Sequence, residues 1–393
     1  KAREVKPASM MIKHYTDALA PEDRVRIIRP VQKMVLAVGA QEVHELEKRY
    51  AALKELFPLL EKLDGAGIAH YEPEVMRGRD PNEPVLALYN PEGYAVNYGL
   101  LAASFAKEAK KNGGDRVEIR TGTTVTRIER DGTGYRVDTE DSSLTARMVV
   151  VDADAYSLGF AKKMGLGKEF SLIPIAGNFY FTPTLLRGKV YTVQEPRMPF
   201  AAVHGDPDLT RDHATRWGPT ARFFPVLEAR KFSTSGAFFR AAGLLRPATW
   251  VSFMAILLEP IRVWYLLQNF VYDLPVIGRY ALAPQLRKIV PGIRAHHLQR
   301  AEGYGGMRLQ RVDTTKRELL LGEGKIVDKN IIFNMTPSPG ASVSLHNALR
   351  DADQIVAFDP HIVFDKKRLL AELCDEKTPV SEDDVSLKES YAS

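Results

Sequence analysis

Apolar residues recur at every third or fourth position between residues 41 and 57, at Val43, Leu46, Tyr50, Leu53 and Phe57. That spacing is typical of one face of an amphipathic helix, which Pro58 then ends. A second helix is predicted over residues 98–111, because Asn97 can cap its start and two glycines follow its end. Between the two helices, the run VLALYN at residues 85–90 predicts a short strand.

The hydrophobic period becomes alternating after residue 116. Short β-rich runs, beginning with VEIR at residues 117–120, predict a β-meander that leads into a buried strand. In that strand, MVVV at residues 148–151 is apolar on both faces, which is the pattern of a central parallel strand. A helix is predicted next, over residues 155–164. A strand, a tight turn and a helix form half of a nucleotide-binding unit.

The same order returns near the end of the chain. Residues 331–333 predict a buried strand, residues 337–340 a Pro/Gly turn, and a helix begins near Ala341. Small residues with free backbone N–H groups at a helix start allow close approach of an anionic or hydrogen-bond-accepting ligand. Such residues are also ordinary loop and cap residues, so both interpretations stay open.

Large apolar and aromatic residues dominate residues 248–272. The uninterrupted apolar run ends at Leu258, well short of the roughly 20 residues that span a bilayer. The residues that would suit a pair of helices at a membrane surface, broken at Pro260, are Trp250, Arg262, Trp264 and Tyr265. A buried helical roof over a substrate domain is equally compatible with this pattern.

The composition is that of a globular protein, with 393 residues, 45% apolar and 26% charged, and a formal net charge of +5. No basic stripe with interleaved aromatics is present, so nucleic acid is a poor candidate partner. The single cysteine, Cys374, excludes a disulfide framework and a Cys-rich metal or iron–sulfur site. Metal catalysis is not expected either, because HExxH and paired Cys/His spacings are absent. Redox chemistry would therefore need an organic cofactor.

Two blocks of sequence resemble known flavoprotein families. Residues 46–57 and GRDPNEPVLALYNPEGYAVNYG at residues 78–99, together with SPGAS at residues 338–342, resemble malate:quinone oxidoreductases. VYTVQEPRMPFAAVHGD at residues 190–206 is similar instead to a segment of L-2-hydroxyglutarate oxidases. Both families belong to one flavoprotein superfamily.

This resemblance implies an α/β (mixed α+β) fold of the p-hydroxybenzoate-hydroxylase type, with an FAD-binding domain built from discontinuous segments and a mixed-sheet substrate domain. A complete Gly-x-Gly-x-x-Gly turn is not found in the sequence, so we expect the first βαβ unit to precede Lys1. The expected division is residues 1–98 as a mainly helical part of the substrate domain, 99–168 as part of the FAD-binding domain with the meander, 169–300 as substrate domain with the apolar helical segment, 301–380 as the C-terminal part of the FAD-binding domain, and 381–393 as a tail.

The resemblance also implies roles for individual residues. His204 is the candidate base that takes the hydroxyl proton as hydride leaves the neighbouring carbon, although a histidine after three apolar residues is also compatible with a structural role. Arg308 would clamp the substrate carboxylate through two parallel bonds. Arg197 would hold a distal carboxylate, or form an exposed salt bridge. The residues expected to bind FAD are Val125, Ala153, Gly305, Gly306, Ser338, Pro339, Gly340, Ala341 and Ser342.

Two departures from the malate:quinone oxidoreductase pattern affect these expectations. Asp152-Ala153-Asp154 stands where the family has Gly-Ala-Gly-Gly, and carboxylates there would repel FAD phosphates unless they turn away. Gly306-Met307-Arg308 stands where the family has Gly-Gln-Arg.

We expect an FAD-dependent oxidation of L-malate to oxaloacetate, a step of the tricarboxylic acid cycle, with a quinone as electron acceptor. The expected location is the cytoplasm, with peripheral contact to the inner face of the cytoplasmic membrane. The alternatives are an L-2-hydroxyglutarate oxidase or dehydrogenase and a non-catalytic flavoprotein-like binding module.

Overall fold

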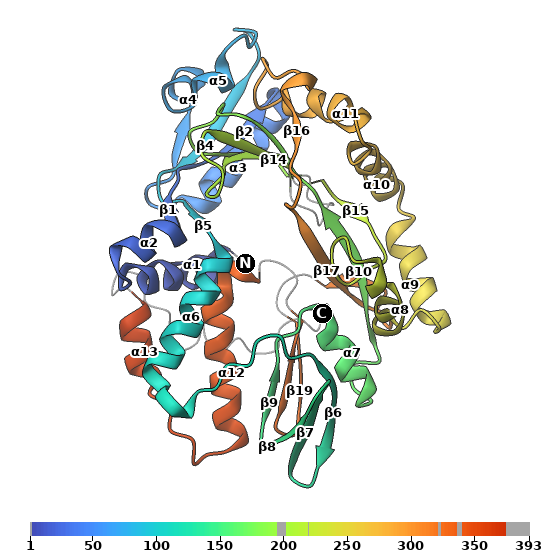
Figure 1. The fold of residues 1–393 in the computed structure, drawn as a ribbon. Helices are drawn as coiled ribbons and strands as arrows, with labels where there is room; N and C mark the ends of the chain where they lie inside the picture. The colour runs from blue at the N-terminus through green and yellow to red at the C-terminus, as the bar shows by residue number, and fades with distance from the viewer. Residues whose placement is uncertain (1, 195–201, 219, 321–323, 336–339, 375–393) are drawn as a thin grey trace.

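The computed structural model describes residues 2–194, 202–218, 220–320, 324–335 and 340–374. Figure 1 shows helices and sheets that follow one another around a ring. The fold is mixed α/β, and the largest sheet combines parallel and antiparallel strand pairs.

The largest sheet has eight strands. Their order is β16 (Gln299–Arg300), β11 (Tyr180–Pro183), β14 (Ala214–Gly218), β13 (His204–Pro207), β12 (Lys189–Thr192), β2 (Lys33–Val38), β4 (Val85–Asn90) and β3 (Glu61–Leu63). β12 pairs with β2 in parallel, and the other neighbours are antiparallel. One face packs into a core around Met34, Val190 and Trp217, which α11 (Ile277–Leu286) and the short helices α4 (Gly65–Tyr71) and α5 (Pro73–Met76) join. Residues of α3 (Ala40–Leu53) pack on the opposite face, over β2 and β4.

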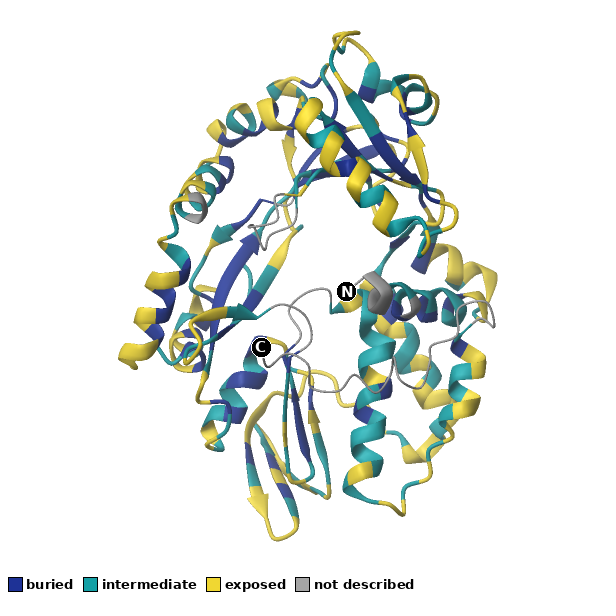
Figure 2. Ribbon diagram, turned by 180° about the vertical axis from the view of Figure 1, so that it is seen from behind, coloured by how far each residue is buried: buried dark blue, intermediate teal, exposed yellow. Residues whose placement is uncertain are grey.

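A second sheet has four strands, in the order β15 (Arg222–Phe223), β10 (Phe170–Gly177), β17 (Gly306–Asp313) and β18 (Glu318–Leu320). Helices α8 (Ser235–Ala242), α9 (Pro247–Leu257) and α10 (Pro260–Tyr272) bury apolar residues against it. These helices lie on the same side of the molecule as β10 and β15 (Figure 1). In Figure 2 they carry exposed residues, while much of the neighbouring β10 is buried.

A third sheet, of three strands, joins two distant parts of the chain. β20 (Ile331–Asn334) lies between β19 (Lys325–Asp328) and β9 (Val149–Val151), and it pairs with β9 in parallel. The meander β6 (Val125–Asp131), β7 (Gly134–Thr139) and β8 (Ser143–Ala146) packs beside it, and α7 (Ala155–Lys163) follows β9. Two strands that are each followed by a helix therefore lie side by side.

The remaining helices gather on the other side of the ring (Figure 1). α1 (Ala2–Asp17) packs against α12 (Ser344–Phe358) and α13 (Lys366–Leu373), so the two ends of the described chain meet. α2 (Pro21–Ile27) and α6 (Tyr98–Gly113) pack beside the two-stranded sheet of β1 (Ile28–Pro30) and β5 (Tyr94–Val96).

Most predicted elements are confirmed. The helix over residues 41–57 is α3, the strand over 85–90 is β4, and Asn97 caps α6 by accepting a hydrogen bond from the Leu100 backbone N–H at 3.1 Å. The strand at residues 331–333 and the helix after Ala341 are β20 and α12, which a short 3-10 turn at Ala341–Val343 precedes.

Two expectations were wrong. Residues 117–120 form no strand, because they follow a 3-10 turn and their apolar side chains find no neighbouring strand. β9 is parallel but not central: it lies at the edge of its described sheet, and Val150 is 37% exposed. An apolar run on both faces does not show how many neighbours a strand has.

Residues 1–98, expected to be mainly helical, also contribute β1 to β5, three of which enter the largest sheet.

Candidate active site

His204 and Tyr191 lie opposite each other on neighbouring strands of the largest sheet. The register of β12 and β13 pairs Tyr191 with His204 and Val190 with Gly205. Because paired residues share a face and successive residues alternate, Val190 enters the core while Tyr191 and His204 point to the other face. Their rings stack with centroids 4.3 Å apart at 26°.

The environment of His204 leaves its imidazole neutral. The residue is only 9% exposed, and burial lowers its pKa from 6.5 to about 4. Its Nδ1 lies 3.0 Å from the carbonyl oxygen of Ala202. Because a carbonyl can only accept, Nδ1 carries the proton and Nε2 keeps its lone pair. A neutral imidazole with a free Nε2 is able to take a proton from a substrate hydroxyl at neutral pH.

A row of charged residues lies two positions along the same face. Arg216 donates to Asp206 at 2.8 and 3.2 Å, and Asp208 lies 3.4 Å from the same guanidinium. The ammonium group of Lys189 approaches Asp206 at 4.0 Å. That of Lys33 lies 5.1 Å from the centre of the Tyr191 ring. A cavity of about 300 Å³ opens beside this row, toward the start of α6.

Arg308 reaches the same region from the second sheet. It lies on β17, opposite Ile175, and is half-buried. Within the described part of the chain its guanidinium makes no hydrogen bond or ion pair, and burial lowers its pKa. Electrostatic interaction with the Tyr265 and Tyr191 side chains acts in the opposite direction and raises the pKa of Arg308.

The turn before Arg308 requires glycine. Gly305 has a φ of +94°, and a Cβ at this position would lie 1.9 Å from the carbonyl oxygen of Gly177. Gly306 is the first residue of β17 and pairs with Gly177, but its Cβ would meet nothing within 4 Å. The two glycines thus bring the β17 backbone against β10 and leave open space beside Gly306.

The parallel strands β9 and β20 provide a site that fits a nucleotide cofactor. Their carboxyl ends lie at one edge of the sheet, and a helix follows each of them. At the end of β20, Asn334 Nδ2 donates to Asp351 at 2.7 Å. Its buried Oδ1 has no hydrogen-bond partner among the described residues and remains able to accept one from a ligand.

Asp152 and Asp154, which were expected to repel phosphates, follow β9 at this edge. Asp152 is exposed. Asp154 is exposed as well, with a φ of 46° and a carboxyl whose pKa is raised by desolvation. The intervening Ala153 has its N–H bonded to Ser157 Oγ at 3.0 Å.

The other predicted cofactor residues are placed as follows. Val125 begins β6 and is exposed. Gly340, Ala341 and Ser342 lead into α12, and this turn packs against α1. Arg197, Ser338 and Pro339 lie outside the described residues. Among the described residues, His, Cys, Asp and Glu side chains form no group that could hold a metal ion.

Sequence reasoning missed Tyr191, Lys33, Asp206 and Arg216. The alternation in KVYT and HGDP could have placed Lys189 with Tyr191, and His204 with Asp206, on common faces. The pairing of β2, β12 and β13 is not visible in that alternation.

Comparisons with known proteins agree with this architecture. The family model described as FAD dependent oxidoreductase matches residues 8–340. The malate:quinone oxidoreductase of Helicobacter pylori strain J99 is 38% identical over 366 residues, which cover 91% of this chain and 80% of that protein. A probable malate:quinone oxidoreductase of Campylobacter jejuni is 39% identical over 363 residues, covering 90% and 80%.

Solved structures show a similar fold. Glycine oxidase from Geobacillus kaustophilus has a TM-score of 0.59 at 17% identity, with 94% of this chain and 82% of that chain covered. L-alpha-glycerophosphate oxidase from Mycoplasma pneumoniae, with FAD bound, has a TM-score of 0.55 at 15% identity, with 90% and 82% covered.

Proposed function

Because the chain belongs to the FAD dependent oxidoreductase family and, within it, to the malate:quinone oxidoreductases, we propose that it oxidises L-malate to oxaloacetate and reduces a quinone. Malate loses two electrons and two protons, and the quinone takes up two of each to become a hydroquinone. FAD, when bound, supplies the hydride-accepting chemistry.

The observation that carries this proposal is the buried, neutral His204, which stacks on Tyr191 beside a row of charged residues that lines a cavity. Nε2 of neutral His204 takes the hydroxyl proton of malate. Arg308 binds a carboxylate of malate through its guanidinium and orients the hydroxyl carbon. A half-buried arginine without an acidic partner among the described residues is suited to this, because a bound carboxylate compensates its desolvation. The role of Arg197 on the distal carboxylate stays a prediction.

FAD would be held from two sides. The edge formed by Ala153, Asn334 and the turn at residues 340–342 would take its phosphate and ribityl region, because two helices begin there. Gly305 and Gly306 would let backbone approach the isoalloxazine ring. The finer assignment to a p-hydroxybenzoate-hydroxylase-like fold, with domains divided near residues 98, 168 and 300, belongs to this proposal. Its support is that β9 and β20, far apart in sequence, pair in parallel.

The names of the curated relatives favour malate over L-2-hydroxyglutarate and favour an enzyme over a non-catalytic module. The two acids differ by one methylene, which a pocket discriminates by only about 1–3 kcal/mol. Activity with both acids must therefore be compared directly.

Peripheral contact with a membrane is also part of the proposal. None of the helices in the described ranges is long and apolar enough to cross a bilayer. α9 to α11 and the residue after α9 instead expose large apolar side chains, which we call the helical patch: Trp250, Val251, Met254, Leu258, Trp264, Leu267, Phe270, Ile277 and Tyr280. Opposite faces of α9 and α10 are buried, and Tyr265, expected at the membrane surface, packs inward. The side chain of Arg262 lies outside the description.

The test uses the protein loaded with FAD under anaerobic conditions. We expect L-malate to bleach the flavin absorbance, and a soluble quinone to restore it, whereas 2-hydroxyglutarate does so at least tenfold more slowly. His204→Gln should keep FAD bound and bleach at least a hundredfold more slowly, in the range typical for loss of a general base. Bleaching at the wild-type rate by the variant would remove the role of His204, and no bleaching of wild type by malate would refute the function.

A further inference from the structure

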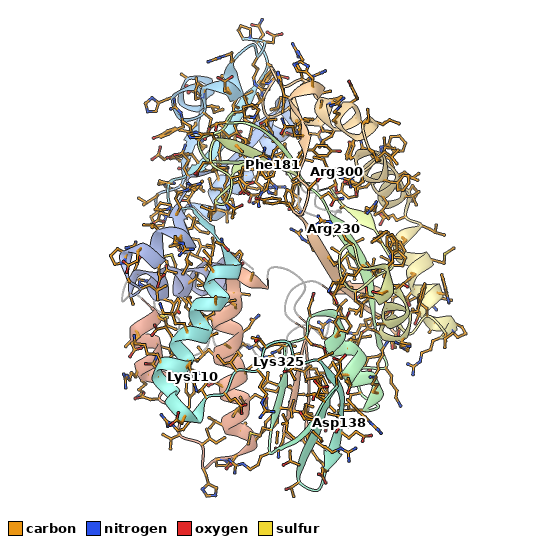
Figure 3. The ribbon with its side chains drawn as sticks, in the orientation of Figure 1. Lys110, Asp138, Phe181, Arg230, Arg300 and Lys325 are labelled. Carbon is orange, nitrogen blue, oxygen red and sulfur yellow. The ribbon has the colours of Figure 1, made fainter. Side chains whose placement is uncertain are left out.

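A second cavity, of about 230 Å³, lies beside the glycine turn and is separate in its lining from the charged row. Gly306 lines it together with Asn178, Arg222, Phe224, Ala229 and Phe232. It therefore lies between the end of β10, the strand β15 and the loop that follows β15. Arg230, which also lines it, donates a hydrogen bond to the carbonyl of Tyr304, whose ring packs edge-on against Phe181 (both Arg230 and Phe181 are labelled in Figure 3).

The walls are aromatic and apolar. Phe224 and Phe232 meet edge to face, with ring centroids 5.2 Å apart at 74°. A flat ring fits between such walls and the small residues Ala229 and Gly306. The absence of a Cβ at Gly306, where nothing lies within 4 Å, keeps one side of the cavity open.

The charged residues that line the cavity are the arginines Arg222 and Arg230, and none of its lining residues is acidic. Arg222 lies over the Phe224 ring at 4.6 Å and forms an ion pair with Asp273 at 3.3 Å. The nitrogen of that ion pair is Nε, which is buried. The backbone of Asn178 is bonded to Thr220, while its side-chain amide has no partner in the described ranges. Such a site favours a ligand whose polar atoms only accept.

The size and position limit the ligand further. Pockets that enclose a drug-sized molecule measure roughly 300–1,000 Å³, so this one takes a ring system and leaves a longer tail outside. Phe232 is 70% exposed at the rim. Asp273, the ion-pair partner of Arg222, is the C-cap of α10, which carries part of the helical patch. The cavity and the patch are therefore joined through α10.

We propose that this cavity binds the headgroup of the quinone acceptor, with its carbonyl oxygens accepting from Asn178 and Arg222 and its tail leaving past Phe232 toward the helical patch. This inference rests on the proposed function, because that function supplies the two electrons. The quinone takes them together with two protons from solvent and leaves as the hydroquinone.

The test measures binding and turnover separately. Equilibrium dialysis gives the Kd of menadione for the FAD-loaded wild type, for Ala229→Phe, which fills the cavity, and for Asn178→Ala, which removes one donor. We expect Kd to rise at least tenfold in Ala229→Phe and about two- to tenfold in Asn178→Ala, the range for one hydrogen bond. Ala371→Phe, an equal change at an exposed position of α13, is the control and should leave Kd unchanged.

Turnover with malate then separates the two cavities. Both variants should reduce ferricyanide, a small soluble acceptor, at close to the wild-type rate, while KM for menadione rises in parallel with Kd. An unchanged Kd in both variants would overturn the proposal, as would a rise in KM for malate with an unchanged KM for menadione. Because dialysis needs no malate, the site can be confirmed or refuted even if the wild type does not oxidise malate.

Discussion

Two residues of the candidate site have pKa values that differ from those of the same side chains in solution. Burial moves the pKa of His204 below its usual value, and it lowers the pKa of Arg308 while leaving that side chain cationic at neutral pH. A neutral buried base, and a half-buried cation with no acidic partner among the described residues, are costly for stability but suited to binding a hydroxy acid anion. Replacing a core residue lowers stability. Replacing Arg308 should instead lower activity and leave stability unchanged or higher.

Replacing Arg308 should weaken catalysis without weakening the fold. Arg308→Met should lower kcat/KM for malate about 10²- to 10⁴-fold, because two charge-assisted hydrogen bonds contribute about 1.5–3 kcal/mol each. Its free energy of unfolding should be unchanged or higher, since an unpaired desolvated charge is removed. Steady-state kinetics and urea unfolding check both parts. Arg308→Lys keeps the charge but not the planar fork, so its kcat/KM for malate should lie between those of wild type and Arg308→Met. A destabilised Arg308→Met with normal kcat/KM would contradict the role.

The pKa of His204 should appear in the pH dependence of stability. The folded pKa of about 4 lies below the value of about 6.5 expected for an unfolded histidine, so the unfolded chain binds the extra proton between these values. The stability contributed by neutral His204 is complete above about pH 6.5 and is lost as pH falls toward 4.

Urea unfolding of wild type and His204→Gln at pH 7.5 and pH 5 measures this loss. Wild type should lose about 2 kcal/mol more than the variant between these pH values. Carboxylates titrate in both proteins and cancel in the difference. Equal losses in the two proteins would show that His204 is not held neutral by burial.

At the scale of elements, β17 carries two features of the candidate site. Its first residue lines the apolar cavity, and Arg308 lies two positions along the same strand. The Gly305–Gly306 turn fixes this placement by bringing the backbone against β10. The sequence identified both glycines but could not show that only one of them is required by sterics.

The two glycines should therefore respond differently to alanine. Gly305→Ala should lower the free energy of unfolding by at least about 2 kcal/mol, because its φ of +94° is strained for alanine and the Cβ would collide with the Gly177 carbonyl. Gly306→Ala, which meets nothing, should change stability by less than about 1 kcal/mol. Thermal or urea unfolding of the pair checks this, and similar losses in both would refute the steric explanation.

The helical patch should determine lipid binding. Trp264 is 68% exposed on α10, and transfer of one large apolar side chain from water contributes about 1.5–3 kcal/mol when complete. Trp264→Glu should therefore weaken co-sedimentation with phosphatidylglycerol–phosphatidylethanolamine vesicles about tenfold or more. Leu59→Glu, at an exposed position outside the patch, is the matched control and should bind as wild type. Equal binding by all three proteins would locate membrane contact elsewhere.

At the scale of the whole molecule, each functional region is assembled from distant parts of the chain. His204 and Arg308 come from different sheets, and the cofactor edge joins β9 to β20. The N-terminal helix α1 packs on α12, α13 and the turn before α12. Because these contacts are non-local, removal of α1 should disturb the turn at residues 340–342 although α1 is remote from it in sequence.

The sequence by itself determined the local elements and the chemistry available to them. Helical and alternating periods placed α3, α6, β4 and β20, because burial of one face imposes these periods on the chain. Resemblance to known flavoprotein families marked His204, Arg308 and the Gly305–Gly306 turn as candidates.

Only the tertiary structure decided which candidates meet and which strands become neighbours. Strand pairing depends on contacts between distant segments, and these leave no period in the sequence. For that reason β9 was predicted to be central, although it lies at the edge of its described sheet. Tyr191 was missed for the same reason, although it stacks on His204. The pKa values of both site residues likewise follow from burial, which is a property of the packed molecule and not of the residue.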